Sequence, residues 1–196
     1  MAQSCATVGY RATTVENVTE LAGVERERFD ALFTGKEDCA LAAFNKFVSE
    51  TLARLSISAS DRRAGNGLDA EQVQVQAVLE LVATLPAFAQ LACVEARHGG
   101  TARLRAAYDS ASRVLALMME RLGTGANGSG VSTLQARASL GALEALVRRE
   151  LTAGRAERLP RLLPDFVYAA LVPFVGQREA LCQARQAARV VLEEGT

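Results

Sequence analysis

The stretch Val8–Asp38 reads VGYRATTVENVTELAGVERERFDALFTGKED, and it decides the fold of this chain. Thr13, followed three residues later by Glu16, is a capping-box signature that predicts the start of a helix. That helix should end at Gly23, after which apolar spacing resumes in a second short helix. Val15, Val18 and Leu21/Ala22 give the first helix one apolar face, and Val15, Val18, Val24 and Phe29 are expected to share one small core. Two short helices joined by a tight turn predict a helix-turn-helix.

This stretch resembles the DNA-binding region of TetR-family transcriptional regulators. The resemblance rests on GY-x-x-TTV-x-x-V-x-x-LAGV at Gly9 to Val24, followed by Phe29, Phe33 and Gly35-Lys36-Glu37. It implies an all-α fold, with an N-terminal helix-turn-helix head and a C-terminal helical-bundle domain for ligand binding and dimerisation. The residues that it places at double-stranded DNA are Thr13, Thr14, Glu25, Arg26, Arg28, Phe29 and Lys36. Lys36 matches a phosphate contact of the family, although a solvated lysine explains it equally well.

The second helix of this head is acidic. Glu25, Glu27 and Asp30 stand where the family usually has a small capping Ser, a Gly and a Tyr. Residues 1–54 hold six basic and eight acidic side chains, and only eight residues precede Gly9, so the family's first helix is short. Because phosphate neutralisation supplies most non-specific DNA affinity, two functions stay open. One is a working regulator, and the other is a TetR-like dimer whose head has lost DNA binding and acts through ligand or protein contacts.

The composition of the chain limits the classes of protein to which it can belong. The 196 residues are 49% hydrophobic, which suffices for a small head and a larger body. With 22 basic and 22 acidic residues the net charge is zero, which argues against strong non-specific attraction to nucleic acid or membrane. The start MAQSCATVG lacks the pattern of a signal peptide, so we expect a cytoplasmic protein.

Side chains that carry catalysis are scarce. The chain has one histidine, no nucleophile motif and no recognisable carboxylate pair, so an enzyme is not expected. The four cysteines are widely separated and lack metal-ligand spacing, which predicts buried free thiols. They are Cys5, Cys39, Cys93 and Cys182. We expect no metal and no cofactor.

The rest of the chain predicts a helical body. Apolar spacing predicts a connector helix over 39–55, and the loop chemistry of 56–68 marks the boundary between a head of residues 1–55 and a body of residues 56–196. Further helices are expected over 69–85, from Pro86 to 98, and over 104–122, 132–151, 162–175 and 181–192. The glycine-rich segment 123–128 reads as a connection, because no strand precedes it as a dinucleotide fingerprint requires.

Helices of such a bundle commonly enclose a ligand pocket. The predicted lining is Leu81, Phe88, Leu91, Glu95, Tyr108, Leu115, Met118, Phe166 and Tyr168. Glu95, Tyr108 and Tyr168 would orient a small apolar ligand, although the Leu115–Met118 stripe also suits plain core packing. Ligand binding would shift two heads away from the repeat of about 34 Å that dimeric regulators need on DNA, which releases a repressor from its operator.

The stretch 166–175 holds ten residues without a charge. It is too short to span a bilayer, so no membrane partner is expected. A helix that is apolar all round must be covered, and a second subunit is the simplest cover. The sequence therefore predicts a homodimer held by helices 132–151 and 162–175. Its predicted contacts are Leu143, Val147, Phe166, Ala170, Leu171, Phe174 and Val175.

Overall fold

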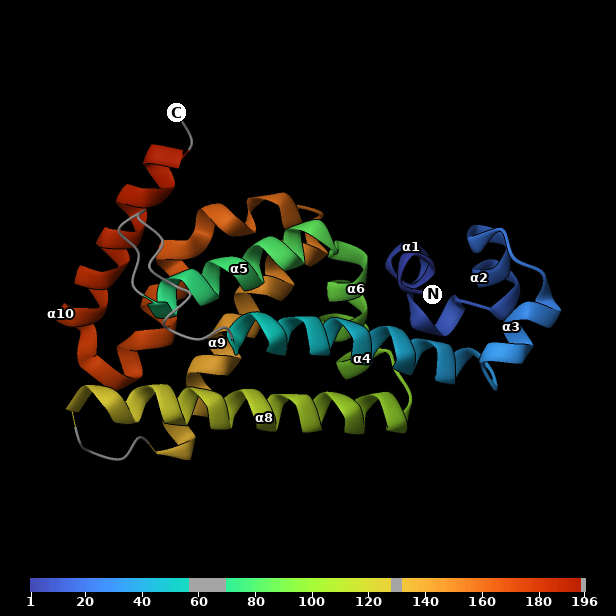
Figure 1. The fold of residues 1–196 in the computed structure, drawn as a ribbon, viewed down its shortest axis with the longest axis horizontal. Coiled ribbons are helices and arrows are strands. Elements are labelled where there is room, and N and C mark those ends of the chain that lie inside the picture. The colour runs from blue at the N-terminus through green and yellow to red at the C-terminus, as the bar shows by residue number, and fades with distance from the viewer. Residues whose placement is uncertain (57–69, 128–131, 195–196) are drawn as a thin grey trace. The chain divides into compact units, whose positions relative to one another are not determined.

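The computed structural model describes residues 1–56, 70–127 and 132–194, and this part of the chain contains helices and connecting turns without strands. The all-α prediction is therefore confirmed. The chain divides into two compact units, one of Met1–Glu50 with Leu85–Ala111 and one of Thr51–Thr84 with Ser112–Thr196. Figure 1 shows the helices of both units, coloured along the chain.

This division differs from the predicted boundary between residues 55 and 56. The first helix of the chain packs against the helical turns after Leu85, so residues 85–111 join the N-terminal unit. The predicted boundary rests on the loop-forming residues at 56–68, which separate two helices along the sequence. The two compact units depend instead on which helices pack together in space. That predicted loop lies almost wholly outside the described residues. The functional division into a DNA-binding head and a ligand-binding body stays a prediction.

The first unit contains the N-terminal helices and the segment around the π-helical turn. Its elements are α1 (Ala2–Ala12), α2 (Val15–Ala22), α3 (Arg26–Leu32), most of α4 (Lys36–Leu55), α6 (Pro86–Gln90), η2 (Leu91–Glu95), α7 (Ala96–His98) and the start of α8 (Ala102–Asn127). As predicted, Pro86 occupies the first turn of its helix, where its missing N–H costs no hydrogen bond.

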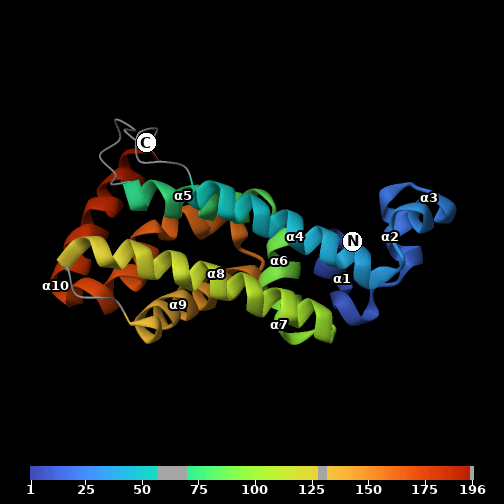
Figure 2. The ribbon, with the colours of Figure 1, turned by 60° about the horizontal axis from the view of Figure 1, so that its bottom comes forward.

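Helices α2 and α3 pack side by side (Figures 1 and 2). Gly23 joins them in the left-handed conformation, with φ 64°, and ends α2 by donating its N–H to Glu20 and Thr19. Val18, Phe29 and Cys39 form a buried core, and the rings of Phe29 and Phe33 lie 5.3 Å apart. The core prediction is confirmed for Val15, Val18 and Phe29.

The predicted core is wrong at Val24, and the predicted apolar face of α2 is wrong at Leu21 and Ala22. Leu21 is 58% exposed and Val24 is 37% exposed, because both lie where the chain turns away from the shared core at Gly23. Ala22 is exposed for the same reason. These side chains add apolar surface next to the turn, and they do not stabilise the packing of α2 on α3.

The capping box of α2 lies one residue later than predicted. Thr14 accepts the backbone N–H of Asn17 at 3.2 Å, and the Asn17 side chain accepts the backbone N–H of Thr14 at 3.0 Å. Thr13 is not the cap, because its hydroxyl donates to the carbonyl of Gly9 at 2.9 Å and so completes the end of α1. Two adjacent threonines therefore serve two different helices.

The second unit is built mainly from the long C-terminal helices. Its further elements are α5 (Ala70–Thr84), α9 (Thr133–Thr152), the 3₁₀ helix η3 (Ala156–Leu162) and α10 (Leu163–Glu194). Helix α9 packs on α10, and two side chains of α9 bond α10 carbonyls: Gln135 at Pro173 (2.7 Å) and Ser139 at Ala170 (3.1 Å). Leu159 and Leu163 are fully buried in this unit.

One glycine segment differs from the sequence prediction, and another glycine separates two helices as predicted. Helix α8 continues through Gly123 to Asn127, so the predicted connection is wrong there, and 128–131 lie outside the described residues. A glycine costs only about 1 kcal/mol within a helix that is already formed. The two helices predicted over 162–175 and 181–192 are both present within α10, which is interrupted between them at Gly176, where φ is 80° and ψ is 170° (Figure 1).

Helix α10 also belongs to the one described segment, Ala156–Leu192, whose length and mean hydropathy match a membrane span. Its part before the bend at Gly176 is Leu163–Val175, in which Asp165 is the one charged residue. At about 1.5 Å per residue this part is roughly 20 Å long, less than the hydrocarbon core of about 30 Å. The four cysteines are free thiols, as predicted, but Cys182 is exposed.

Candidate nucleic-acid interface

The outer surface of α3 carries the charges that would meet DNA. Glu25, Glu27 and Arg28 are exposed, and within the described chain their side chains form no hydrogen bond or ion pair. Glu25 stands at the N-terminal cap of α3 without making a side-chain cap bond. These three side chains are therefore available to an external partner, and two of them are negative.

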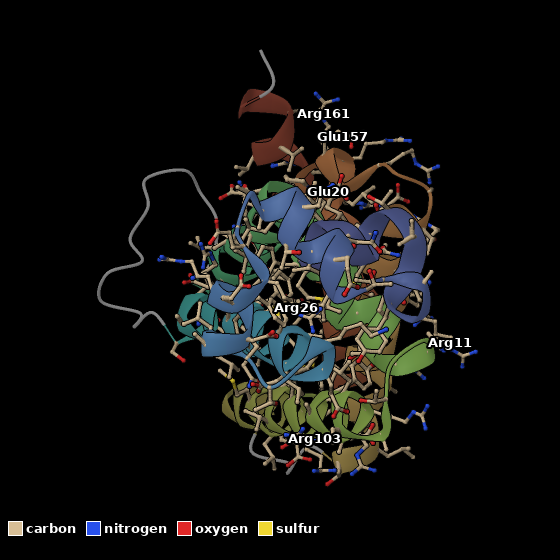
Figure 3. The ribbon with its side chains drawn as sticks, turned by 90° about the vertical axis from the view of Figure 1, so that its right-hand side faces the viewer. Arg11, Glu20, Arg26, Arg103, Glu157 and Arg161 are labelled. Carbon is tan, nitrogen blue, oxygen red and sulfur yellow. The ribbon has the colours of Figure 1, made fainter. Side chains whose placement is uncertain are left out.

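Arg26 is committed to two carboxylates of its own chain. Its Nε donates to both carboxylate oxygens of Asp30 at 3.0 Å, and its NH1 donates to Glu16 Oε1 of α2 at 2.7 Å. The bond to Asp30 raises the pKa of Arg26, which keeps its charge fixed. The side chain is 52% exposed, but its charge is outnumbered by the two carboxylates beside it. Figure 3 marks Arg26, and also Glu20 on α2.

Lys36 holds the end of α1. Its ammonium donates to the carbonyls of Thr13 at 2.8 Å, Tyr10 at 3.0 Å and Arg11 at 3.4 Å, and it lies 4.6 Å from the centre of the Tyr10 ring. An ammonium has three N–H donors, and all three are used here. A cation at a helix C-terminus is also favoured by the helix dipole. Lys36 would have to leave these carbonyls before it could bind a DNA phosphate.

Two other predicted DNA contacts lie inside the unit. Thr13 is 1% exposed, and Phe29 is 3% exposed in the core between α2 and α3. Thr13 would reach DNA only if its packing against α1 opened, and Phe29 only if the α2–α3 core opened. Thr14 is exposed, although its hydroxyl caps α2. Among the predicted contacts, Thr14, Glu25 and Arg28 are therefore exposed without a competing ion pair inside the described chain.

Glu95 binds the bend of α1. Gly9 has φ 78° and ψ 159°, which interrupts α1 and leaves the Tyr10 N–H without a helical acceptor. Glu95 Oε2 accepts that N–H at 2.8 Å. A Cβ at Gly99 would lie 2.5 Å from the same oxygen, so only glycine fits there without displacing Glu95. The sequence predicts that Glu95 orients a ligand. The sequence signal for its structural role is the pair of glycines beside its carboxylate, Gly9 and Gly99.

Glu37 completes a set of internal contacts around the Gly35-Lys36-Glu37 motif. It accepts hydrogen bonds from the Thr101 hydroxyl and, at 3.1 Å, from Arg103 NH1. The Thr101 bond first, and Arg103 second, lower the pKa of Glu37. These contacts fasten the start of α4 to the start of α8 inside the first unit. The motif that resembles a DNA-contact segment thus has structural partners in this chain.

The predicted pocket residues fall in both units. Phe88, Leu91, Glu95 and Tyr108 belong to the first unit, and Leu81, Leu115, Met118, Phe166 and Tyr168 belong to the second. Leu81, Leu91 and Phe166 are buried, while Tyr108 accepts a 3.4 Å hydrogen bond from Arg97. A pocket that uses the whole set stays a prediction.

The predicted dimer contacts all lie in the second unit. Val147 and Phe166 are buried within the chain and are therefore poor candidates for contact with a partner. The others, Leu143, Ala170, Leu171, Phe174 and Val175, are partly exposed. Together with Tyr168, Ala169 and Val172 they leave an apolar stretch of α10 incompletely covered. The homodimer stays a prediction, and its candidate contacts no longer include the buried Val147 and Phe166.

No family model matches this chain, and no curated protein or solved structure is similar to it. Its function must be argued from the residues themselves. The features that bear on function are the exposed face of α3, the internally bonded cations beside it and the partly covered face of α10.

Proposed function

We propose that the chain is a TetR-like, ligand-responsive transcriptional regulator that binds double-stranded DNA through a helix-turn-helix made of α2 and α3. The observation that carries this proposal is the pair of short helices joined at Gly23 and fixed by Val18 and Phe29. In such a motif the second helix enters the major groove and contacts base edges. The outer face of α3 is exposed, as this role requires.

The charges on α3 favour selective and weak DNA binding. Arg28 can bind a phosphate, and Glu25 or Glu27 can accept a hydrogen bond from a cytosine amino group. Arg26 and Lys36 are held by internal partners, so few phosphates are neutralised. Non-specific affinity should therefore be low and only weakly dependent on salt.

The second unit supplies the remaining parts of the proposal. The partly covered face of α10 fits a homodimer, and a small apolar ligand bound in the helical body would change the spacing of two heads. Such a ligand would release a repressor from its operator in the cytoplasm.

The test is binding-site selection from genomic DNA with the full-length protein, followed by fluorescence anisotropy on the selected site. Replacing Arg28 by Ala should weaken binding about tenfold, since a lost DNA contact costs about 1–3 kcal/mol. Arg105→Ala is the matched control, because Arg105 is an exposed arginine of the same unit, on α8. Equal effects of the two substitutions, or no selected site, would count against α3 as the DNA-binding helix.

A second candidate is a TetR-like dimer that does not bind DNA. It is favoured by the bonding of Arg26 to Asp30 and Glu16, which removes a cation from the surface of α3. Failure to select any DNA, combined with a stable dimer that binds a small molecule, would support this candidate.

A further inference from the structure

Glu150 lies near the end of α9 in the second unit and is almost completely buried. Its side chain is 4% exposed, and its carboxylate accepts hydrogen bonds from Arg149 Nε at 2.8 Å and from Arg155 Nε at 2.9 Å. A second bond from Arg155, through NH2, measures 3.3 Å. A buried carboxylate is costly unless it is paired, and the two guanidiniums supply that pairing.

The two arginines remain at the surface. The side chain of Arg149 is 59% exposed and that of Arg155 is 41% exposed, while the carboxylate behind them is covered. Hydrogen bonds from Arg155 and then from Arg149 lower the pKa of Glu150, so it stays charged and holds both guanidiniums in place. Most N–H donors of these guanidiniums have no acceptor within the described part of the chain.

The 3₁₀ helix η3 follows Arg155 directly and carries two more exposed arginines, Arg158 and Arg161. Residues three apart eclipse one another in a 3₁₀ helix, so Arg158 and Arg161 lie along one side of η3, and Arg155 stands directly before it as its N-cap residue. Arg158 and Arg161 are exposed and form no ion pair with any residue that the structure describes. Figure 3 shows the Arg161 side chain extending away from the ribbon near Glu157.

We define Arg149, Arg155, Arg158 and Arg161 as the α9–η3 arginine cluster. Two carboxylates oppose its four positive charges, the buried Glu150 and the exposed Glu157. We propose that this cluster binds the phosphate group of an anionic ligand. The planar guanidinium fork matches the oxygens of a phosphate, and a fork already oriented by a buried carboxylate loses less entropy on binding.

A purely structural role explains only part of this cluster. Fastening η3 to α9 needs Glu150, Arg149 and Arg155, whereas Arg158 and Arg161 add charge repulsion without any described bond in return. A phosphate bound across the row would offset that repulsion. Its source is either a small phosphorylated molecule or the phosphodiester backbone of nucleic acid. The site lies outside the α2–α3 motif, so it does not depend on the proposed function.

The first experiment measures the binding of inorganic pyrophosphate to the full chain by isothermal titration calorimetry. Wild type should bind, and Arg158→Ala with Arg161→Ala should weaken binding at least about tenfold, since these are charge-assisted contacts. The matched control is Arg178→Ala with Arg185→Ala, which removes two exposed arginines of α10 and should change affinity less than about twofold. Circular dichroism would check that every variant keeps its helical content.

A conservative variant tests geometry rather than charge. Arg155→Lys keeps the positive charge but lacks the fork, so it should also weaken pyrophosphate binding. Binding by this variant equal to that of wild type would mean that the cluster attracts anions only by net charge, and it would overturn the proposed site.

The second experiment repeats the comparison with a random-sequence DNA duplex, using fluorescence anisotropy. If only pyrophosphate binding depends on Arg158 and Arg161, the ligand is a small phosphorylated molecule. If only DNA binding depends on them, the phosphate source is nucleic acid. The proposal is overturned if wild type binds neither probe, or if the cluster variant and the α10 control behave alike with both. Failure of the Arg28→Ala test leaves these outcomes unaffected, because Arg28 lies in the other unit.

Discussion

At the scale of single residues, the partners of a charged side chain decide what it can bind. Lys36 and Arg28 both lie in the segment that resembles a DNA-binding region, but only Arg28 is exposed without a described partner. Lys36 donates instead to three carbonyls at the end of α1. Residue type alone would rank the two cations equally, and hydrogen bonding separates them.

Glu150 gives a prediction about pH. Its pKa is lowered in the folded state, so its contribution to stability is present above the ordinary Glu pKa of about 4.3 and is lost as pH falls through the folded value. Glu150→Gln should therefore lower the melting temperature at pH 7, and the difference from wild type should shrink below about pH 4. Thermal melts followed by circular dichroism measure this.

The exposed neighbour Glu157 provides the control for that measurement. Glu157→Gln should leave the melting temperature close to that of wild type at both pH values, because an exposed charge contributes little. A Glu150→Gln deficit that stays constant from pH 7 to pH 3 would show that packing, and not the charge of the carboxylate, stabilises this position.

At the scale of elements, bends in two helices depend on glycine. In α1, Gly9 occupies a conformation with φ 78° that L-residues rarely adopt, and an added Cβ would make only an ordinary van der Waals contact, 3.7 Å from Glu95 Oε2. Gly9→Ala should therefore destabilise the protein through backbone strain by about 1–3 kcal/mol. Chemical denaturation at neutral pH would measure the change.

The matched control is Gly141→Ala. Gly141 lies inside α9 with nothing within 4 Å of an added Cβ, so alanine should be neutral or stabilising by up to about 1 kcal/mol. Equal effects of the two substitutions would mean that α1 straightens at no cost. In that case the Tyr10 N–H bond to Glu95 would not be needed to hold the first unit together.

At the scale of the whole molecule, the partly covered stretch of α10 bears on assembly. Leu171 lies in this stretch and is partly exposed. If a second subunit covers it, Leu171→Arg should give monomer or aggregate in light scattering, because obligate interfaces are apolar. Leu117→Arg is the control, since Leu117 is an apolar residue of α8, 54% exposed and outside the predicted contacts. An unchanged dimer mass for Leu171→Arg would remove α10 from the interface.

The amino-acid sequence alone predicts that the chain is all-α, and it places most helix ends within a few residues of those observed. These properties depend on apolar spacing and on caps within a few residues, as at Gly23 and at Pro86. Even there, the predicted cap of α2 lies one residue early, because Thr13 with Glu16 fits the usual capping-box signature, whereas the observed box pairs Thr14 with Asn17. The acidic character of α3 also followed directly from Glu25 and Glu27.

Which charged side chains already have hydrogen-bond partners within the chain depends on the packing of distant helices. Glu95 and Tyr10 are 85 residues apart in sequence, and no local pattern predicts their hydrogen bond. Lys36 likewise reaches carbonyls 23 to 26 residues away. The grouping of residues 85–111 with the N-terminal helices has the same origin. Helices form from interactions within about one turn, whereas the partners of a charged group depend on how distant helices pack.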